Sequence, residues 1–262
     1  LSIILLCFLT GCSLEPEQKE VDQLKAAQDR GKFIVGVSYD TKPFGFLQNG
    51  QPAGFDVDIA KYIAKSILGK DNSIEFVETK GYDSISMVAA GKVDFLIAAT
   101  TITPQRQLTV DFSDPYYTTG QAILIAPNAK IVKIKDLNHK KVIVQLNSTA
   151  EKTQQTFAPQ AITLKYKSHK IAFEEFKAGN GDAIISDEAL LKGFVTDNPK
   201  FKILPFKLSI EPYGVVIKKM DDNNQLKTEI NHALEKMKTD GTLSKLCLLY
   251  TSPSPRDRTR SR

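Results

Sequence analysis

Arg106 is the residue whose type and position most clearly predict chemistry. It ends the segment TTITPQR (100–106), which follows an apolar run, 95–98, typical of a buried strand. Thr followed by Pro is typical of a helix start, so we expect Arg106 in the first turn of a helix. The helix dipole disfavours a cation there, and the arginine therefore needs an anion. A bidentate carboxylate, also held by the Thr101 hydroxyl and backbone N–H groups, would supply one.

Polar residues follow other apolar runs as well. Ligands in open α/β sheets bind beyond the carboxyl ends of the strands. The side chains at these ends are therefore the candidates for binding. They are Tyr39-Asp40, Ala99 to Thr101, Asn147 to Thr149, and Ser186-Asp187.

The elements that must position these residues alternate between strand and helix, which predicts an α/β fold. Residues 33–37 (FIVGV) form a strand, and 56–68 form a helix with an acidic first turn and Gly69 as its C-terminal cap. The segment AGKVDFLI (90–97) recurs in pattern as AGNGDAII (178–185). In each copy a helix ends at Gly, an Asp follows, and an apolar strand begins. Two units of the same plan predict two lobes.

Several motifs occur in one order along residues 32–246. They are GFDVDIA (54–60), AGKVD (90–94), TITPQR (101–106), VDFSDPYY (110–117) and DGT (240–242). Together they resemble the polar amino-acid family of solute-binding proteins, the receptors of ABC importers. The resemblance implies a two-lobed Venus-flytrap fold of the type II periplasmic binding protein class, with two crossover strands. It places lobe 1 at 32–121 and 213–246 and lobe 2 at 128–209, with hinges near Ile125-Ala126 and Ile210-Glu211.

The resemblance also implies a role for each candidate residue. Arg106 and Thr101 would hold the ligand's α-carboxylate, in a loop where Ala99 replaces the family's usual glycine. Asp187 would pair with the α-ammonium, and Ser148 and Thr149 would present backbone N–H groups from lobe 2. The remaining candidates are Tyr82, which would pack on the ligand, then Phe44, and Asp40 at the mouth of the cleft.

The ligand's side chain stays open between glutamine, glutamate and aspartate. Relatives that bind acidic amino acids often have an Arg near the position of Ser84. The absence of this Arg weakens the case for an acidic ligand. Other stretches, such as 64–69 and 211–215, still resemble the acidic branch. At the turn before Ser148, Asn147 stands where Gly is common; Asn tolerates a positive φ, so the turn can survive.

The first residues predict a membrane anchor. Leu1 to Leu9 is apolar but too short to span a bilayer, which needs about 20 residues. It fits the apolar part of a secretion signal whose start is missing, and Leu-x-Gly-Cys at its end resembles a bacterial lipobox. We therefore expect 1–12 to be a partial signal, Cys12 to carry a lipid, and 13–31 to be a linker. The protein would lie outside the cytoplasm, on the cell membrane.

The last residues are expected to be foreign. CLLYTSPSPRD (247–257) matches the translation of a common transposase sequencing adapter, so 247–262 is excluded from the fold. This tail has four Arg and one Asp, a net of +3, so the formal net charge of +5 becomes +2 without it. The case for a nucleic-acid partner then disappears. With Cys7 in the signal, only Cys12 remains, and a core without disulfides must stabilise the fold.

The other reactive residue types predict no enzyme, no cofactor and no metal. His139, His169 and His232 have no metal-ligand spacing and are interpreted as surface residues. No Ser or Cys lies in a nucleophile motif. The alternatives are a cyclohexadienyl-dehydratase-like enzyme, which would need Asp187 as its acid, and a sensor or permease-fused receptor. The expected partners are a free amino acid and a permease, with the binding protein itself a monomer.

Overall fold

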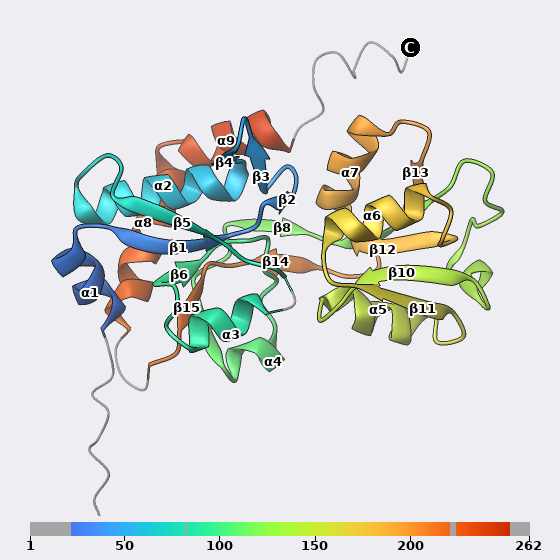
Figure 1. Cartoon of the computed structure of the whole chain (residues 1–262), viewed down its shortest axis with the longest axis horizontal. Helices are drawn as coiled ribbons and strands as arrows, with labels where there is room; N and C mark the ends of the chain where they lie inside the picture. Colours follow the sequence, from blue (N-terminus) through green and yellow to red (C-terminus); the bar gives the residue numbers. More distant parts are fainter. Residues whose placement is uncertain (1–21, 82, 221–223, 252–262) are drawn as a thin grey trace, which may run out of the picture.

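The computed structural model describes residues 22–81, 83–220 and 224–251, and within them two five-stranded sheets organise two lobes. The first sheet has the order β5 (Ile74–Glu78), β1 (Phe33–Val37), β6 (Phe95–Leu96), β15 (Val216–Lys218) and β7 (Val110–Phe112). The second has the order β11 (Ile162–Tyr166), β10 (Lys141–Gln145), β12 (Ala183–Asp187), β9 (Gln121–Ile125) and β13 (Lys202–Ile203). As predicted, the fold is α/β with two lobes, which lie side by side in Figure 1.

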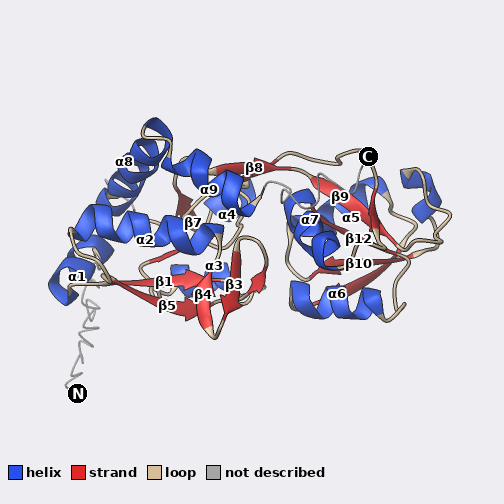
Figure 2. Ribbon diagram, turned by 90° about the horizontal axis from the view of Figure 1, so that it is seen from above, coloured by secondary structure: helices blue, strands red, loops and turns tan. Residues whose placement is uncertain are grey.

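Two antiparallel strands, β8 (Tyr117–Thr119) and β14 (Glu211–Tyr213), pass between the lobes. Figure 2 shows β8 bridging the gap between them. The hinge expected at Ile125-Ala126 is wrong, because Ile125 lies in β9 and pairs with β12 and β13 inside the second sheet. The hinge expected at Ile210-Glu211 coincides with the start of β14. A small sheet of β2 (Asp40–Thr41), β3 (Gly45–Gln48) and β4 (Gln51–Ala53) lies beside the first lobe's end of the cleft.

Helices cover both faces of each sheet (Figure 1). Those of the first lobe are α1 (Gln23–Arg30), α2 (Phe55–Leu68), α3 (Ser84–Ala89), α4 (Pro104–Gln107), α8 (Gln225–Thr239) and α9 (Thr242–Tyr250). Those of the second are the 3₁₀ turn η1 (Ile134–Leu137), α5 (Thr149–Phe157), α6 (His169–Lys177) and α7 (Glu188–Asp197). None of the helices in the described ranges has the length and apolar character needed to cross a membrane.

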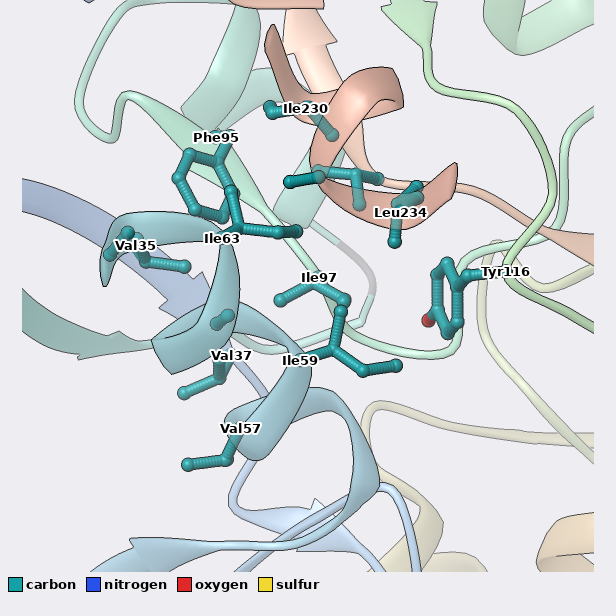
Figure 3. Close-up of a cluster of buried hydrophobic side chains, with 14 of the residues drawn as sticks. Val35, Val37, Val57, Ile59, Ile63, Phe95, Ile97, Tyr116, Ile230 and Leu234 are labelled. Carbon is teal, nitrogen blue, oxygen red and sulfur yellow. The ribbon is translucent and has the colours of Figure 1, made fainter. Parts of the chain in front are cut away.

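The cores follow from the alternation of side chains along each strand. In β1, Val35 and Val37 face α2 and α8, while Ile34 faces the cluster around α3. Figure 3 shows the larger of these clusters, where Ile59 and Ile63 of α2 meet Ile230 and Leu234 of α8. The second sheet alternates in the same way, with Ile143 on one face of β10 and its neighbours on the other. Both lobes therefore bury apolar residues on two sides, without disulfides among the described residues.

The sequence repeat has a structural cause. Asp94 Oδ2 accepts a hydrogen bond from the N–H of Ile34 (2.6 Å), at the start of β1. Asp182 Oδ2 accepts the equivalent bond from the N–H of Lys141 (2.7 Å), at the start of β10. In each lobe this aspartate ties together the starts of the central parallel pair, β1 with β6 and β10 with β12, at the end of the strands where they begin.

The ends of the fold differ from the expected boundaries. Residues 23–30, expected to be part of a linker, form α1, whose buried Leu24 and Ala27 belong to the first lobe's core. Helix α9 continues beyond the expected end at 246, and the Tyr250 hydroxyl donates to Asp58 Oδ2 (2.7 Å). Cys12 with the signal and residues 252–262 lie outside the described residues.

Candidate functional site

Arg106 lies beside the loop that follows β6. The Thr103 hydroxyl caps α4 by accepting the Arg106 N–H (3.2 Å), and Pro104 begins the helix, as predicted. Helix α4 is a single turn, so its dipole is weaker than the prediction assumed. The guanidinium Nη1 donates to the Thr101 carbonyl (2.8 Å). Burial lowers the pKa of Arg106, whereas Asp187, Glu211 and Tyr213 act in the opposite sense. A desolvated cation at this position favours an anionic ligand group.

Asp187 lies across the cleft from Arg106, at the end of β12. Its buried carboxylate accepts a hydrogen bond from the Tyr213 hydroxyl of the crossover strand β14. Burial raises the pKa of Asp187 to about 7, with the Glu211 charge adding to the rise and Tyr213 and Arg106 opposing it. The N–O distance between Arg106 and Asp187 exceeds that of an ion pair, since none joins them in the described part of the chain. The two opposite charges therefore do not neutralise each other directly, although both line the same cleft.

The second lobe adds the start of α5 to the cleft. Asn147 has a φ of +60°, so the asparagine does adopt the left-handed turn expected of it. Ser148 is the N-cap of α5 and makes no side-chain cap bond, because its hydroxyl donates back to the Gln145 carbonyl (2.7 Å). The Thr149 hydroxyl donates to Glu211 Oε2 (2.9 Å) and accepts from Gln121 Nε2 (2.6 Å). The first residues of this nine-residue helix line the cleft, where their free N–H groups would favour an anion.

One cleft joins these elements, with an accessible volume of about 60 Å³. It brings together most of the predicted site residues: Ala99, Thr101, Arg106, Ser148, Thr149 and Asp187. Ser84 also lines it, with its hydroxyl donating to the Gly81 carbonyl (3.2 Å). Arg106 is the one Lys or Arg in the described lining, and Asp187 the one Asp or Glu. The rest of that lining is uncharged and mainly polar, apart from the titratable His169.

Two predicted residues fall outside this lining, and a third cannot be placed. Asp40 lies at the mouth, as expected, where it accepts bonds from the Ser38 hydroxyl (2.8 Å) and from the N–H of Lys170 in the second lobe (3.4 Å). Phe44 is wrong as a cleft residue: it is fully buried and packs edge-on against Phe55, Tyr117 and Tyr213. Tyr82 lies outside the described residues.

Sequence reasoning missed His169, which it interpreted as a surface residue. His169 begins α6, lines the cleft and stacks on Phe173. Burial lowers the pKa of its imidazole, although the Asp40 charge opposes this. The signal was present, because Ser168-His169 follows the strand 162–166 at the same sheet edge as Asn147. Gln121 and Gln145 were also missed; both line the cleft, and both are buried.

The lobes touch each other around the cleft. Lys42 Nζ of the first lobe pairs with Asp197 Oδ2 of the second (3.0 Å). A Cβ on Gly81 would lie 2.5 Å from Gln145 Nε2, so the lobes approach closely there too. The structure is therefore a closed arrangement. Within the described residues, no cluster of His, Cys, Asp or Glu could hold a metal ion.

A cleft with this charge pattern between two hinged lobes is typical of a receptor for a small solute. Residues 33–252 match the family described as bacterial extracellular solute-binding proteins, family 3. The chain belongs to this family. One curated relative, the "ABC transporter glutamine-binding protein GlnH" of Bacillus subtilis (strain 168), is 35% identical over 242 residues, 91% of this chain and 88% of the relative.

Solved structures of family members have the same architecture. "An ancestral arginine-binding protein bound to arginine" superposes with a TM-score of 0.78 at 40% identity, covering 85% of this chain and 99% of that one. The same description "bound to glutamine" gives a TM-score of 0.78 at 40% identity, over 84% and 98% of the two chains. These matches confirm the type II periplasmic binding protein fold. The family is one of binding proteins rather than enzymes, as predicted.

Proposed function

We propose that this solute-binding protein captures a free α-amino acid with an uncharged polar side chain, glutamine first, and delivers it to the permease of an ABC importer. The supporting observation is the distribution of charge in the cleft. One cation, Arg106, and one carboxylate, Asp187, face each other across a lining otherwise made of uncharged and mainly polar side chains. A zwitterionic backbone supplies one partner of opposite sign to each.

The α-carboxylate would bind between Arg106 and the loop at Thr101, closed from the other side by the N–H groups of Ser148 and Thr149. Two N–H donors of a guanidinium match the two oxygens of a carboxylate. The α-ammonium would meet Asp187, whose other hydrogen bond, from Tyr213, already orients the carboxylate. An ammonium in this place would lower the pKa of Asp187 and keep it ionised.

We infer that the ligand's side chain is neutral because the rest of the described cleft lining has no further Lys, Arg, Asp or Glu. Ser38, Thr41, Thr79, Ser84 and Gln145 offer hydroxyl and amide groups and no charge. The second carboxylate of glutamate would enter without a cation, and the guanidinium of arginine without a second carboxylate. A buried, unpaired charge is strongly unfavourable. The relative described as a glutamine-binding protein adds support for an amide.

We extend the proposal to the protein's place in the cell. A lipid on Cys12 would hold the binding protein at the outer side of the membrane, where the closed form would dock on the permease as a monomer. The lobe assignment carries over with revised limits, the second lobe running from about 120 to 210 between the crossover strands.

Isothermal titration calorimetry of the purified chain against the twenty amino acids tests the proposal. Glutamine is expected to bind at least about tenfold more tightly than glutamate, since one unpaired charge costs more than 1.4 kcal/mol. Arg106→Ala should weaken binding at least about a hundredfold, because it leaves the ligand carboxylate without its cation. Arg30→Ala is the matched control: Arg30 pairs with Asp94, away from the cleft, and its loss should leave affinity unchanged. Binding of no amino acid, or equal binding by Arg106→Ala, would contradict the proposal.

A further inference from the structure

Asp56 is a buried carboxylate directly behind the cleft, and the binding scheme above does not use it. Its side chain is fully buried in the first turn of α2. Oδ2 accepts a hydrogen bond from the Ala99 N–H (2.7 Å), and Oδ1 accepts one from the Tyr116 hydroxyl (2.9 Å). Burial raises the pKa of Asp56 to about 7, and these two bonds act against the rise. Burying a carboxylate costs free energy of desolvation unless hydrogen-bond donors compensate for the lost water.

Ala99, the donor to Asp56, has an unfavourable backbone conformation. Its φ is +48°, in the left-handed region, where a Cβ costs about 1–2 kcal/mol. Ala99 lines the cleft, two residues before Thr101, whose carbonyl accepts the Arg106 guanidinium. The loop must therefore keep a strained residue in place so that Thr101 and Arg106 stay aligned.

The other end of this loop is fixed by different contacts. Thr101 forms an isolated antiparallel bridge with Tyr213, and the N–H of Ile102 donates to the Pro212 carbonyl (2.8 Å). Gly214 donates its N–H to the Thr100 carbonyl (3.1 Å). These bonds hold residues 100–102 against β14, whereas the N–H of Ala99 donates to Asp56 Oδ2 and also lies close to the Tyr116 hydroxyl.

We propose that Asp56 is a positioning residue: its hydrogen bond from the Ala99 N–H holds the 98–101 loop in the left-handed conformation that aligns Thr101 and Arg106 with the ligand's carboxylate. This inference rests on the proposed function. Asp56 touches no ligand and acts through Ala99. Tyr116, whose hydroxyl donates to the other carboxylate oxygen, immediately precedes the crossover strand β8, so the Asp56 side chain connects α2, the cleft loop and the start of the crossover.

The first test is a double-mutant cycle on ligand affinity, with glutamine as the probe. Asp56→Leu removes the acceptor at similar volume and is expected to weaken binding about tenfold, the effect of one hydrogen bond to a charged group. Ala99→Gly removes the strain and should change affinity less than about twofold. In the double variant Asp56→Leu/Ala99→Gly the loss should shrink to about threefold, because glycine holds the left-handed conformation unaided. Additive effects, or affinity within twofold for a folded Asp56→Leu, would overturn the inference.

Two further variants separate positioning from a general loss of stability. Asp56→Asn keeps an acceptor for Ala99, and its amide can donate to the Tyr116 oxygen, so it should retain affinity within about threefold. Asp94→Asn is the matched control, since Asp94 is another buried aspartate of the first lobe that accepts a backbone N–H, at Ile34. It should lower the unfolding temperature with no loss of affinity. An equal loss of affinity in Asp94→Asn would show that lobe stability, not the loop, governs binding.

A measurement without ligand keeps this inference distinct from the proposed function. In NMR spectra of the ligand-free protein, the Ala99 amide proton should resonate downfield, as expected of a short bond to a carboxylate, and move upfield in Asp56→Asn but not in Asp94→Asn. An unchanged Ala99 resonance in Asp56→Asn would overturn the inference even where glutamine binds. If the Ala99 resonance moved as expected but the protein bound no amino acid, the role of Asp56 would stand and only the proposed function would be contradicted.

Discussion

At the scale of single residues, the two carboxylates with raised pKa values have opposite relations to the ligand. Asp56 lies behind the loop and accepts hydrogen bonds from two protein donors, the Ala99 N–H and the Tyr116 hydroxyl. Asp187 faces the cleft, where it accepts a hydrogen bond from Tyr213 and lies within reach of the Gln121 amide. The pKa of Asp187, about 7, is set mainly by burial, and a ligand ammonium would supply the missing positive partner.

Ligand affinity should therefore increase with pH between about 5.5 and 8. Protonated Asp187 cannot pair with an ammonium, and its pKa in the empty closed form is raised to about 7, while the bound ligand lowers it. The association constant should rise by up to about tenfold per pH unit below 7 and level off above it. Calorimetry at four pH values measures this slope. Asp187→Asn should bind more weakly and lose the pH dependence, and an analogue lacking the amine should show none. A steeper slope in Asp187→Asn would be inconsistent with this role.

The sequence predicted Thr101 and Asp187 from their places at the ends of apolar runs, and Arg106 from the helix start that follows one of them. It also places His169 directly after the strand 162–166, a signal that was overlooked, but it could not predict Asp56. Asp56 is 43 residues from Ala99, and only the closure of α2 over the sheet brings them together. The prediction for Phe44 was wrong for the same reason. An aromatic ring could pack on a ligand, but Tyr117 and Tyr213 of the crossover strands pack around Phe44 instead.

At the scale of elements, the repeat proved the most informative pattern. Gly followed by Asp predicted the starts of the strands at 95 and 183, and the structure shows Asp94 and Asp182 bonded to β1 and β10. The position of the hinge was not predictable in this way. The apolar run 121–125 would have the same sequence pattern in a strand that links the lobes and in a strand inside a sheet. Only its pairing with β12 shows that it lies inside the second sheet.

The turn before α5 gives a prediction at this scale. Asn147 has a positive φ, so Asn147→Val should destabilise the protein by about 1–2 kcal/mol, whereas Asn147→Gly should not. Because this turn aims the first N–H groups of α5, Asn147→Val should also weaken ligand binding. His139 is the matched control: it has a φ of +61°, is exposed in the same lobe and lies outside the cleft lining. In urea titrations, His139→Val should lower the free energy of unfolding by about as much as Asn147→Val, but it should leave ligand affinity unchanged. Equal affinity for Asn147→Val and wild type would argue against a role for this turn in binding.

At the scale of the whole molecule, closure depends on a few contacts between the lobes. The ion pair between Lys42 and Asp197 lies at the mouth, near the bond from the Lys170 N–H to Asp40. Both partners of the ion pair are about half exposed, 51% and 56%, so solvent and salt screen it. Exposed pairs contribute about 0.2–1 kcal/mol. The ligand, not this pair, must supply most of the free energy of closure.

Lys42→Ala should therefore weaken glutamine binding by about two- to fivefold, since it removes a contact made only in the closed form. The effect should vanish in 0.5 M salt, where the pair is screened. Lys32→Ala is the control, because Lys32 forms a comparably exposed pair with Glu75 inside the first lobe, whose geometry closure does not change. Calorimetry at low and high salt, with small-angle scattering of the ligand-free variants, measures both affinity and closure. If Lys42→Ala and Lys32→Ala changed affinity equally, the pair at the mouth would have no special part in closure, and the free energy would reside in the contacts around Arg106 and Asp187 alone.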